Sequence, residues 1–367
     1  MKQISILINK EAQNLGLYYG YWNWFLYFQK ELNELGLEVK FFNKLSKKFL
    51  DSDYLFFNSR SFKSHHDNVD LLSLKKIYNM NNNIYWFDMR DSAGTTQFEV
   101  LPFVKKYIKK QLYKDQEVYF KSLYGGRYYT DFYYKKFNVR DSQNYIQTKP
   151  NRKLIQKVTL GWNIGVAQIF DYSKYSRIDY WKEYLKFRYF NKKGFDKALN
   201  FNDNIYNKNN DIVCLMNKNF KRETVGYQRK KLHRFIKKSN YKNCIYNQRL
   251  SKKDYIKILK NSKISLGSYG WGEICYREFE AIRCGASFIT ADMSNIDTWP
   301  NIYIENETYL PYSLDFSDIT DVINEILYNH KLRKKLIKNS QEILRSTHNL
   351  IGKKYFVNKL IEILDIN

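Results

Sequence analysis

The residues best suited to bind a charged ligand lie between Gly267 and Gly285, where the sequence reads GSYGWGEICYREFEAIRCG. A glycine-bearing loop at the start of a helix offers free backbone N–H groups and the positive end of the helix dipole to an anion. Arg277 has the forked guanidinium that binds phosphate through two parallel hydrogen bonds, and Glu280 can accept hydrogen bonds from paired sugar hydroxyls. These residue types favour the binding of a phosphate beside a sugar.

Two buried strands must hold this loop and helix in place. The apolar run from Ile264 to Leu266 predicts a strand before the loop, and a second apolar run follows Gly285, which can end the helix in a left-handed conformation. By helical periodicity, one charged stripe consists of Glu273, Arg277, Glu280 and Cys284, and the opposite apolar stripe consists of Cys275, Phe279 and Ile282. The apolar stripe is expected to pack on a sheet. A solvated helix face is the alternative, because Glu273 and Arg277 have the spacing of an ordinary helical ion pair.

Five residues of this segment fit the pattern R-x-F-E-A-x-x-x-G, namely Arg277, Phe279, Glu280, Ala281 and Gly285. With this pattern the segment resembles the donor-binding element of GT-B glycosyltransferases, in the branch shared by exostosin-like proteins and bacterial enzymes. The resemblance implies an α/β fold of two facing Rossmann-like domains and a nucleotide-sugar donor, with Glu280 on the ribose and Arg277 near the diphosphate. Retaining members often carry another acid eight residues before the Glu of the pattern. That position is Gly272 here and the acid is Glu273, which leaves inversion or retention open.

Neighbouring residues are expected to complete a donor site. Gly270, Gly272 and Glu273 border it in the loop. The apolar run from Asp211 to Met216 predicts the first strand of a second domain, and in the family a basic residue just after this strand reaches the diphosphate. The candidates are Lys218, Lys221, Arg222 and Arg229, and their spacing does not decide between them. Such cations can neutralise the charge that develops as a nucleoside diphosphate departs, so we expect no cofactor and no obligatory metal.

Two acids at the end of another predicted strand are candidates for a general base. The apolar run from Ile84 to Phe87 is followed by Asp88, Arg90 and Asp91. In open α/β sheets, ligands bind at this carboxyl end of the strands. A carboxylate there could take the proton from an acceptor hydroxyl, and we prefer Asp91 to Asp88 for this role. The alternative is a polar loop with an internal Asp–Arg pair.

An aromatic loop near the N-terminus is the predicted acceptor site. The loop, residues 9–23, follows a predicted strand and precedes a predicted helix over 24–35, and it contains Gly16, Tyr19 and Gly20 among further aromatic residues. It lacks the glycine spacing and the later acid of a dinucleotide-binding turn. The alternative is a loop that packs on its own aromatic rings.

The length of 367 residues suits two domains. We predict a Rossmann-like acceptor domain over 1–160, a connecting segment over 161–210, and a Rossmann-like nucleotide-sugar-binding domain over 211–340. By resemblance, a helical segment over 341–367 returns toward the first domain. Four Cys without metal-ligand spacing fit a reducing cytoplasm, and the N-terminus shows no long apolar run typical of a secretory signal. We therefore expect a cytoplasmic protein, peripheral at the membrane at most.

The net charge of +25 comes from 62 Lys and Arg against 37 Asp and Glu, and alone it would indicate a polyanionic partner. However, heavy use of Lys, Asn, Tyr and Ile with only four Pro is typical of an AT-rich genome, and no RNA-binding signature is present. Nucleic acid is therefore disfavoured, while contact with anionic lipid stays open. The block 97–145 is predicted to be helical, with Lys105, Lys106, Lys109 and Lys110 on a solvated face.

These observations predict a metal-independent, hexosyltransferase-like enzyme. It would move a sugar from a nucleotide-sugar donor to a hydroxyl of a glycan or lipid-linked acceptor, and the resemblance implies a role in bacterial surface polysaccharide synthesis. The alternative from another class is a non-catalytic or nucleic-acid-binding protein on the same two-domain scaffold. A hydrolase or epimerase of nucleotide sugars is a third alternative.

Overall fold

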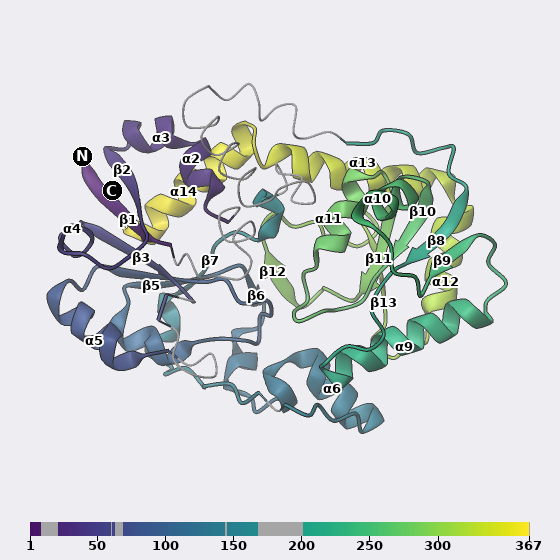
Figure 1. The fold of residues 1–367 in the computed structure, drawn as a ribbon, viewed down its shortest axis with the longest axis horizontal. Helices are drawn as coiled ribbons and strands as arrows, with labels where there is room; N and C mark the ends of the chain where they lie inside the picture. The colour runs from purple at the N-terminus through teal and green to yellow at the C-terminus, as the bar shows by residue number, and fades with distance from the viewer. Residues whose placement is uncertain (9–20, 60, 63–68, 144, 168–200, 367) are drawn as a thin grey trace.

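The computed structural model describes residues 1–8, 21–59, 61–62, 69–143, 145–167 and 201–366 (Figure 1). They form two α/β domains, each built on its own parallel sheet. The predicted fold class, two Rossmann-like domains, is thereby confirmed.

The N-terminal domain contains a six-stranded sheet in the order β2-β1-β3-β4-β5-β7, with all strands parallel. The strands are β1 (Lys2–Leu7), β2 (Leu37–Phe42), β3 (Tyr54–Asn58), β4 (Ile84–Asp88), β5 (Lys106–Lys109) and β7 (Val158–Leu160). Every residue of β3 and β4 is buried, as expected for central parallel strands covered on both faces. This sheet brings the residues that follow β4 and β5 to one edge.

The C-terminal domain contains a five-stranded parallel sheet in the order β13-β11-β10-β8-β9. Its strands are β8 (Asn210–Cys214), β9 (Cys244–Tyr246), β10 (Ser262–Leu266), β11 (Ser287–Ala291) and β13 (Leu310–Tyr312). The helices between and after them are α9 (Glu223–Lys238), α10 (Lys252–Lys260), α11 (Tyr276–Arg283), α12 (Ile319–Tyr328) and α13 (His330–Ser346). Ligands of such sheets bind at the carboxyl ends of the strands, which here include the loop from β10 to α11.

Local sequence signals place two helix ends of this domain correctly. The Ser251 hydroxyl caps α10 by accepting a hydrogen bond from the Asp254 N–H at 3.1 Å. Gly285 follows α11 with φ of +67°, the left-handed conformation predicted for it. Two members of the predicted apolar stripe of α11, Phe279 and Ile282, are fully buried as expected, whereas Cys275 is the N-cap and lies before the helix.

Among the described elements, a strand and a helix extend from the C-terminal half to the N-terminal domain. Strand β12 (Ile296–Thr298), from the C-terminal half, pairs antiparallel with β6 (Gln111–Tyr113) of the N-terminal half. Helix α14 (Leu350–Leu364), yellow in Figure 1, lies against the N-terminal domain, where Phe356 packs in one core with Trp24 and Trp162.

Two predictions of secondary structure are wrong. The block 97–145 is not simply helical: it contains strands β5 and β6 before helix α6 (Tyr128–Phe137). Lys109 is fully buried instead of solvated, because it forms an ion pair with Asp88 across neighbouring strands. The helix predicted over 24–35 is divided at Phe28 into α2 (Asn23–Tyr27) and α3 (Gln29–Glu34). Within the described ranges, no helix combines the length and the apolar character needed to cross a bilayer.

Candidate functional site

A cleft of about 380 Å³ opens between the two domains. From the N-terminal domain its wall includes Met89 and Asp91, which follow β4, and Lys110 and Gln111, which follow β5. From the C-terminal domain its wall includes Gly270, Trp271, Gly272, Tyr276, Arg277 and Arg229. The carboxyl ends of both sheets therefore contribute to the same space.

Arg277 lies in the first turn of α11 and lines this cleft. One Nη donates a hydrogen bond to the carbonyl oxygen of Ser268 at 2.5 Å, while the buried Nε has no hydrogen-bond partner among the described residues. No carboxylate in the described part of the chain lies within ion-pair distance of the guanidinium. The side chain thus retains hydrogen-bonding capacity. Burial opposes its charge, but Cys275 and the nearby Glu278 carboxyl outweigh burial and hold the pKa of the guanidinium above its ordinary value.

Arg229 on α9 reaches the same cleft and is only 5% exposed. Its Nη1 donates to the carbonyl oxygen of Asn217 at 3.0 Å, and its guanidinium carbon lies 4.3 Å from the centre of the Phe220 ring. Burial, together with the neighbouring charge of Arg277, lowers the pKa of Arg229 to about 10. Its Nε also lacks a partner, and it has no carboxylate partner among the residues described.

The guanidinium groups of Arg229 and Arg277 form a candidate anion-binding site. Buried charges are normally paired, because removing an ion from water is costly. Here two like charges share one cleft beside the glycine-bearing loop, and neither forms an ion pair with a carboxylate of the described residues. A diphosphate would supply the missing negative charge and accept the unused N–H groups.

Glu280, one turn after Arg277 on α11, does not form part of the cleft wall. Its carboxylate forms an ion pair with Lys252 at the start of α10, and its side chain is 20% exposed. The same carboxylate raises the pKa of the Tyr255 hydroxyl, after burial, which is the larger cause. A role of Glu280 on a ribose stays a prediction.

Glu273 does not lie on the stripe of α11, because the helix begins only at Tyr276, after Cys275 as its N-cap. Its carboxylate is 3% exposed and accepts hydrogen bonds from the Ser92 hydroxyl at 2.7 Å and the Ala93 N–H at 3.0 Å. The expectation that Glu273 shares a face with Arg277 is therefore wrong. Its side chain binds the other domain.

The two glycines of the loop differ in what surrounds them. A Cβ added to Gly270 would lie 3.2 Å from the Cys275 sulfur, a tight contact with a side chain. A Cβ added to Gly272 would lie 1.6 Å from the backbone carbonyl oxygen of Asp91. Only glycine at 272 lets the loops of the two domains approach this closely.

The basic residues after β8 differ in their position relative to the cleft. Lys218 is exposed and absent from the cleft wall. Arg222 is also outside it: it donates to the Tyr129 hydroxyl at 2.8 Å and to the Trp271 carbonyl oxygen at 3.0 Å, which makes it a contact between the domains. Of the alternatives that spacing left open, Arg229 is the one that the structure brings next to Arg277.

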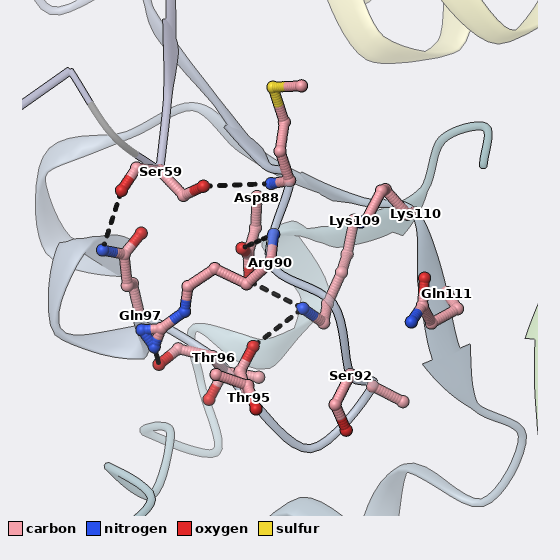
Figure 2. Close-up of polar contacts among 12 residues, drawn as sticks. Ser59, Asp88, Arg90, Ser92, Thr95, Thr96, Gln97, Lys109, Lys110 and Gln111 are labelled. Carbon is pink, nitrogen blue, oxygen red and sulfur yellow. Dashed lines mark hydrogen bonds and ion pairs between the residues drawn. The ribbon is translucent and has the colours of Figure 1, made fainter. Parts of the chain in front are cut away.

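The two candidate bases occupy opposite environments. Asp88 is fully buried, and its carboxylate accepts hydrogen bonds from Lys109 at 2.8 Å and from the Arg90 N–H at 2.9 Å (Figure 2). It also accepts one from the Tyr107 hydroxyl at 2.5 Å. Burial opposes ionisation of Asp88, but the charges of Lys109 and Arg90 outweigh it and hold its pKa below the ordinary value. A saturated, ionised carboxylate without solvent access has no capacity for a proton from substrate, so we assign Asp88 to the structure of the loop.

Asp91 lies at the cleft wall with 54% of its side chain exposed. Its carboxylate is 3.4 Å from the Lys110 ammonium, and its backbone carbonyl oxygen accepts a hydrogen bond from the Gln111 side chain at 2.5 Å. The position is open to an incoming hydroxyl, as a general base requires.

Some predicted residues lie outside the described residues, namely Gly16, Tyr19 and Gly20 of the acceptor loop. Tyr21, which belongs to the predicted acceptor loop, lines the cleft. Other residues of the cleft wall were missed by sequence reasoning, namely Asn163, Phe220, Trp271 and Tyr276. Aromatic residues are common throughout the chain, so their types gave no signal.

Comparison with known protein families finds a match for the C-terminal half of the chain. Residues 210–352 match a family model described as "Glycosyl transferase-like". No curated protein matches the sequence. The C-terminal half of the chain is thus similar to this family over those residues.

Several solved structures resemble the whole chain at low identity. They include the T4 phage BGT in complex with its UDP-glucose substrate, with 14% identity, a TM-score of 0.45 and 100% of each chain covered. A glycosyltransferase from Rickettsia africae has 12% identity and a TM-score of 0.44, over 99% of this chain and 98% of the other. Anabaena Alr3699/HepE in complex with UDP has 11% identity and a TM-score of 0.46, over 99% of this chain and 100% of the other.

Proposed function

We propose that this protein is a glycosyltransferase that moves a sugar from a nucleotide-sugar donor to an acceptor hydroxyl in the interdomain cleft. One observation carries the proposal: Arg229 and Arg277 both line the cleft without a carboxylate partner in the described residues. The match of residues 210–352 to a glycosyl transferase-like family supports it.

The arginines would bind the donor diphosphate. Arg277 already has one Nη committed to the Ser268 carbonyl oxygen, which orients the guanidinium and leaves other N–H groups for phosphate oxygens. As the bond from sugar to diphosphate breaks, negative charge grows on the departing nucleoside diphosphate, and fixed cations stabilise it. We propose that these arginines, without an obligatory metal, supply that charge.

Asp91 would take the proton from the acceptor hydroxyl. It projects from the opposite domain into the same cleft, where the Lys110 ammonium lies 3.4 Å from its carboxylate. In this arrangement one domain binds the leaving group and the other activates the attacking group. A hexosyl donor, a glycan or lipid-linked acceptor and a role in bacterial surface polysaccharide synthesis remain predictions from the resemblance.

A thermal-shift screen with UDP, GDP, ADP and pyrophosphate tests the donor site. We expect one nucleoside diphosphate to raise Tm by mass action, and to do so in EDTA as well as in Mg²⁺. The matching nucleotide sugars are then incubated with glycan acceptors, and released nucleotide is measured. If no nucleotide shifts Tm, or if only nucleic acid does so with a steep salt dependence, the glycosyltransferase proposal is wrong. Nucleotide release that does not depend on an acceptor would indicate a hydrolase instead.

A further inference from the structure

We infer that Glu273 is a positioning residue that holds Asp91 in place against the donor loop. The inference rests on the proposed function, because it concerns how the base is presented to the cleft. Glu273 belongs to the C-terminal domain, and both of its hydrogen-bond donors belong to the N-terminal loop that carries Asp91.

The contacts of Glu273 fall on the two residues directly after Asp91. Ser92 and Ala93 are both fully buried, and their hydroxyl and N–H groups point at the two oxygens of one carboxylate. The Ser92 hydroxyl in turn accepts a hydrogen bond from the Gly94 N–H at 3.2 Å. The carboxylate therefore fixes the turn that follows the base.

Two further contacts fix Asp91 from other sides. The backbone of Gly272 lies so close to the Asp91 carbonyl oxygen that a Cβ there would lie 1.6 Å away. The same carbonyl oxygen accepts a hydrogen bond from Gln111, beside the point where strands β6 and β12 join the domains. Gly270 and Gly272 also line the cleft. The loop before α11, which borders the arginines, is therefore in direct contact with the loop after β4, which carries Asp91.

A need for stability alone does not explain a carboxylate at this place. Glu273 is almost completely buried and forms no ion pair with any described residue. A buried carboxylate costs free energy unless its hydrogen bonds compensate for lost hydration, and an apolar side chain would seal such an interface at lower cost. The directional acceptors of a carboxylate, however, fix the distance and orientation of Asp91, which apolar contact does not.

The test compares E273A, E273Q and S92A with a matched control, D315A. Asp315 also links the two domains, because its carboxylate forms an ion pair with the Lys136 ammonium at 2.6 Å. That ion pair does not involve the Asp91 loop. For each protein, the Kd of UDP, the kcat and KM for UDP release from UDP-glucose with acceptor, and the hydrogen exchange of peptides that contain Ala93 are measured.

We expect E273A to bind UDP within about twofold of the wild type, to lose about 10- to 100-fold in kcat, and to exchange the Ala93 amide faster. E273Q, whose amide oxygen can still accept one hydrogen bond, and S92A, which removes one of the two donors, should lie between. D315A should match the wild type in kcat and at Ala93. A kcat of E273A equal to that of the wild type, or an equal loss in D315A, overturns the inference.

The proposed function can fail separately. If the wild type binds no nucleoside diphosphate, the glycosyltransferase proposal is wrong, and Ala93 exchange alone then decides whether Glu273 holds the loop. Unchanged exchange in folded E273A or E273Q would overturn that role as well.

Discussion

Replacement of Arg229 by Gln should raise the stability of the ligand-free protein. The variant should also bind nucleoside diphosphates more weakly than the wild type. The pKa of Arg229 is lowered to about 10, chiefly by burial and then by Arg277. A lowered pKa means that folding disfavours the charged form, and the side chain stays charged at pH 7. This lowering of the pKa corresponds to about 3 kcal/mol of destabilisation of the folded protein at every pH below the folded pKa.

The substitution also removes favourable contacts, which limits the gain. The hydrogen bond to the Asn217 carbonyl oxygen and the stacking on Phe220 contribute about 1 kcal/mol each. The net expectation for R229Q is therefore a gain of about 1 kcal/mol, which is a rise of about 2 to 4 °C in the Tm of a domain of this size. Loss of a charge-assisted contact to phosphate costs about 1.5 to 3 kcal/mol, so affinity should fall about 10- to 150-fold.

Calorimetry of the empty protein and titration with UDP and pyrophosphate measure the two effects. K218Q is the matched control, because Lys218 follows the same strand but is exposed and lies outside the cleft wall. Its affinity should change by less than about twofold, as for an exposed charge. If R229Q lowers Tm and leaves affinity unchanged, Arg229 is structural and the argument from uncompensated charge is wrong.

Three further predictions concern the base, the contact of the loops and pH. D91N should lower the rate of transfer by about 10²- to 10⁴-fold with UDP affinity unchanged, as a transfer assay measures. D88N should instead destabilise the fold by about 3 to 5 kcal/mol in denaturant unfolding, because it leaves Lys109 buried without its partner. G272A should cost about 1 to 3 kcal/mol of stability and G270A less, because only the former places a Cβ against backbone of the other domain; equal Tm values for the two variants would contradict this. Burial raises the pKa of Glu278 to about 7. Its contribution to stability is therefore fully present below the unfolded pKa of about 4.5 and is lost as the pH rises through 7. Relative to E278Q, the wild type should lose about 3 kcal/mol of stability between pH 4.5 and 8, and parallel curves of Tm against pH for the two proteins would refute this prediction.

Much of the scaffold could be predicted because its signals are local. Fully apolar runs gave the central strands, Gly285 gave the end of α11, and Ser251 gave the start of α10. Each of these depends on residues within a few positions of the feature itself. Because ligands of parallel sheets bind at the carboxyl ends of the strands, the sequence also predicts that the loop after β4 and the loop after β10 border a ligand site, and both line the same cleft.

The errors come from partners that are distant in sequence. Lys109 looked like part of a solvated helix face, but it lies in a strand and pairs with Asp88, 21 residues earlier. Glu273 looked like a member of the α11 stripe, but the chain becomes helical only at Tyr276, so helical spacing does not apply to it. Its actual donors lie 180 residues or more away, in the other domain. No periodicity within one segment carries that information.

The distribution of charge across the cleft favours transfer over tight binding of the donor alone. The cations of the C-terminal wall, Arg229 and Arg277, gain most when negative charge on the ligand increases, and that happens only as the sugar leaves the diphosphate. On the opposite wall, Asp91 is attracted to positive charge, which grows on the acceptor oxygen and on the sugar carbon in the same step. A protein that only binds nucleotides would have no use for an exposed carboxylate in the same cleft as its arginines, since the carboxylate repels the diphosphate. The buried hydrogen bonds of Glu273 hold that carboxylate in place despite the repulsion, and this is the arrangement that a transition state with separated charges would require.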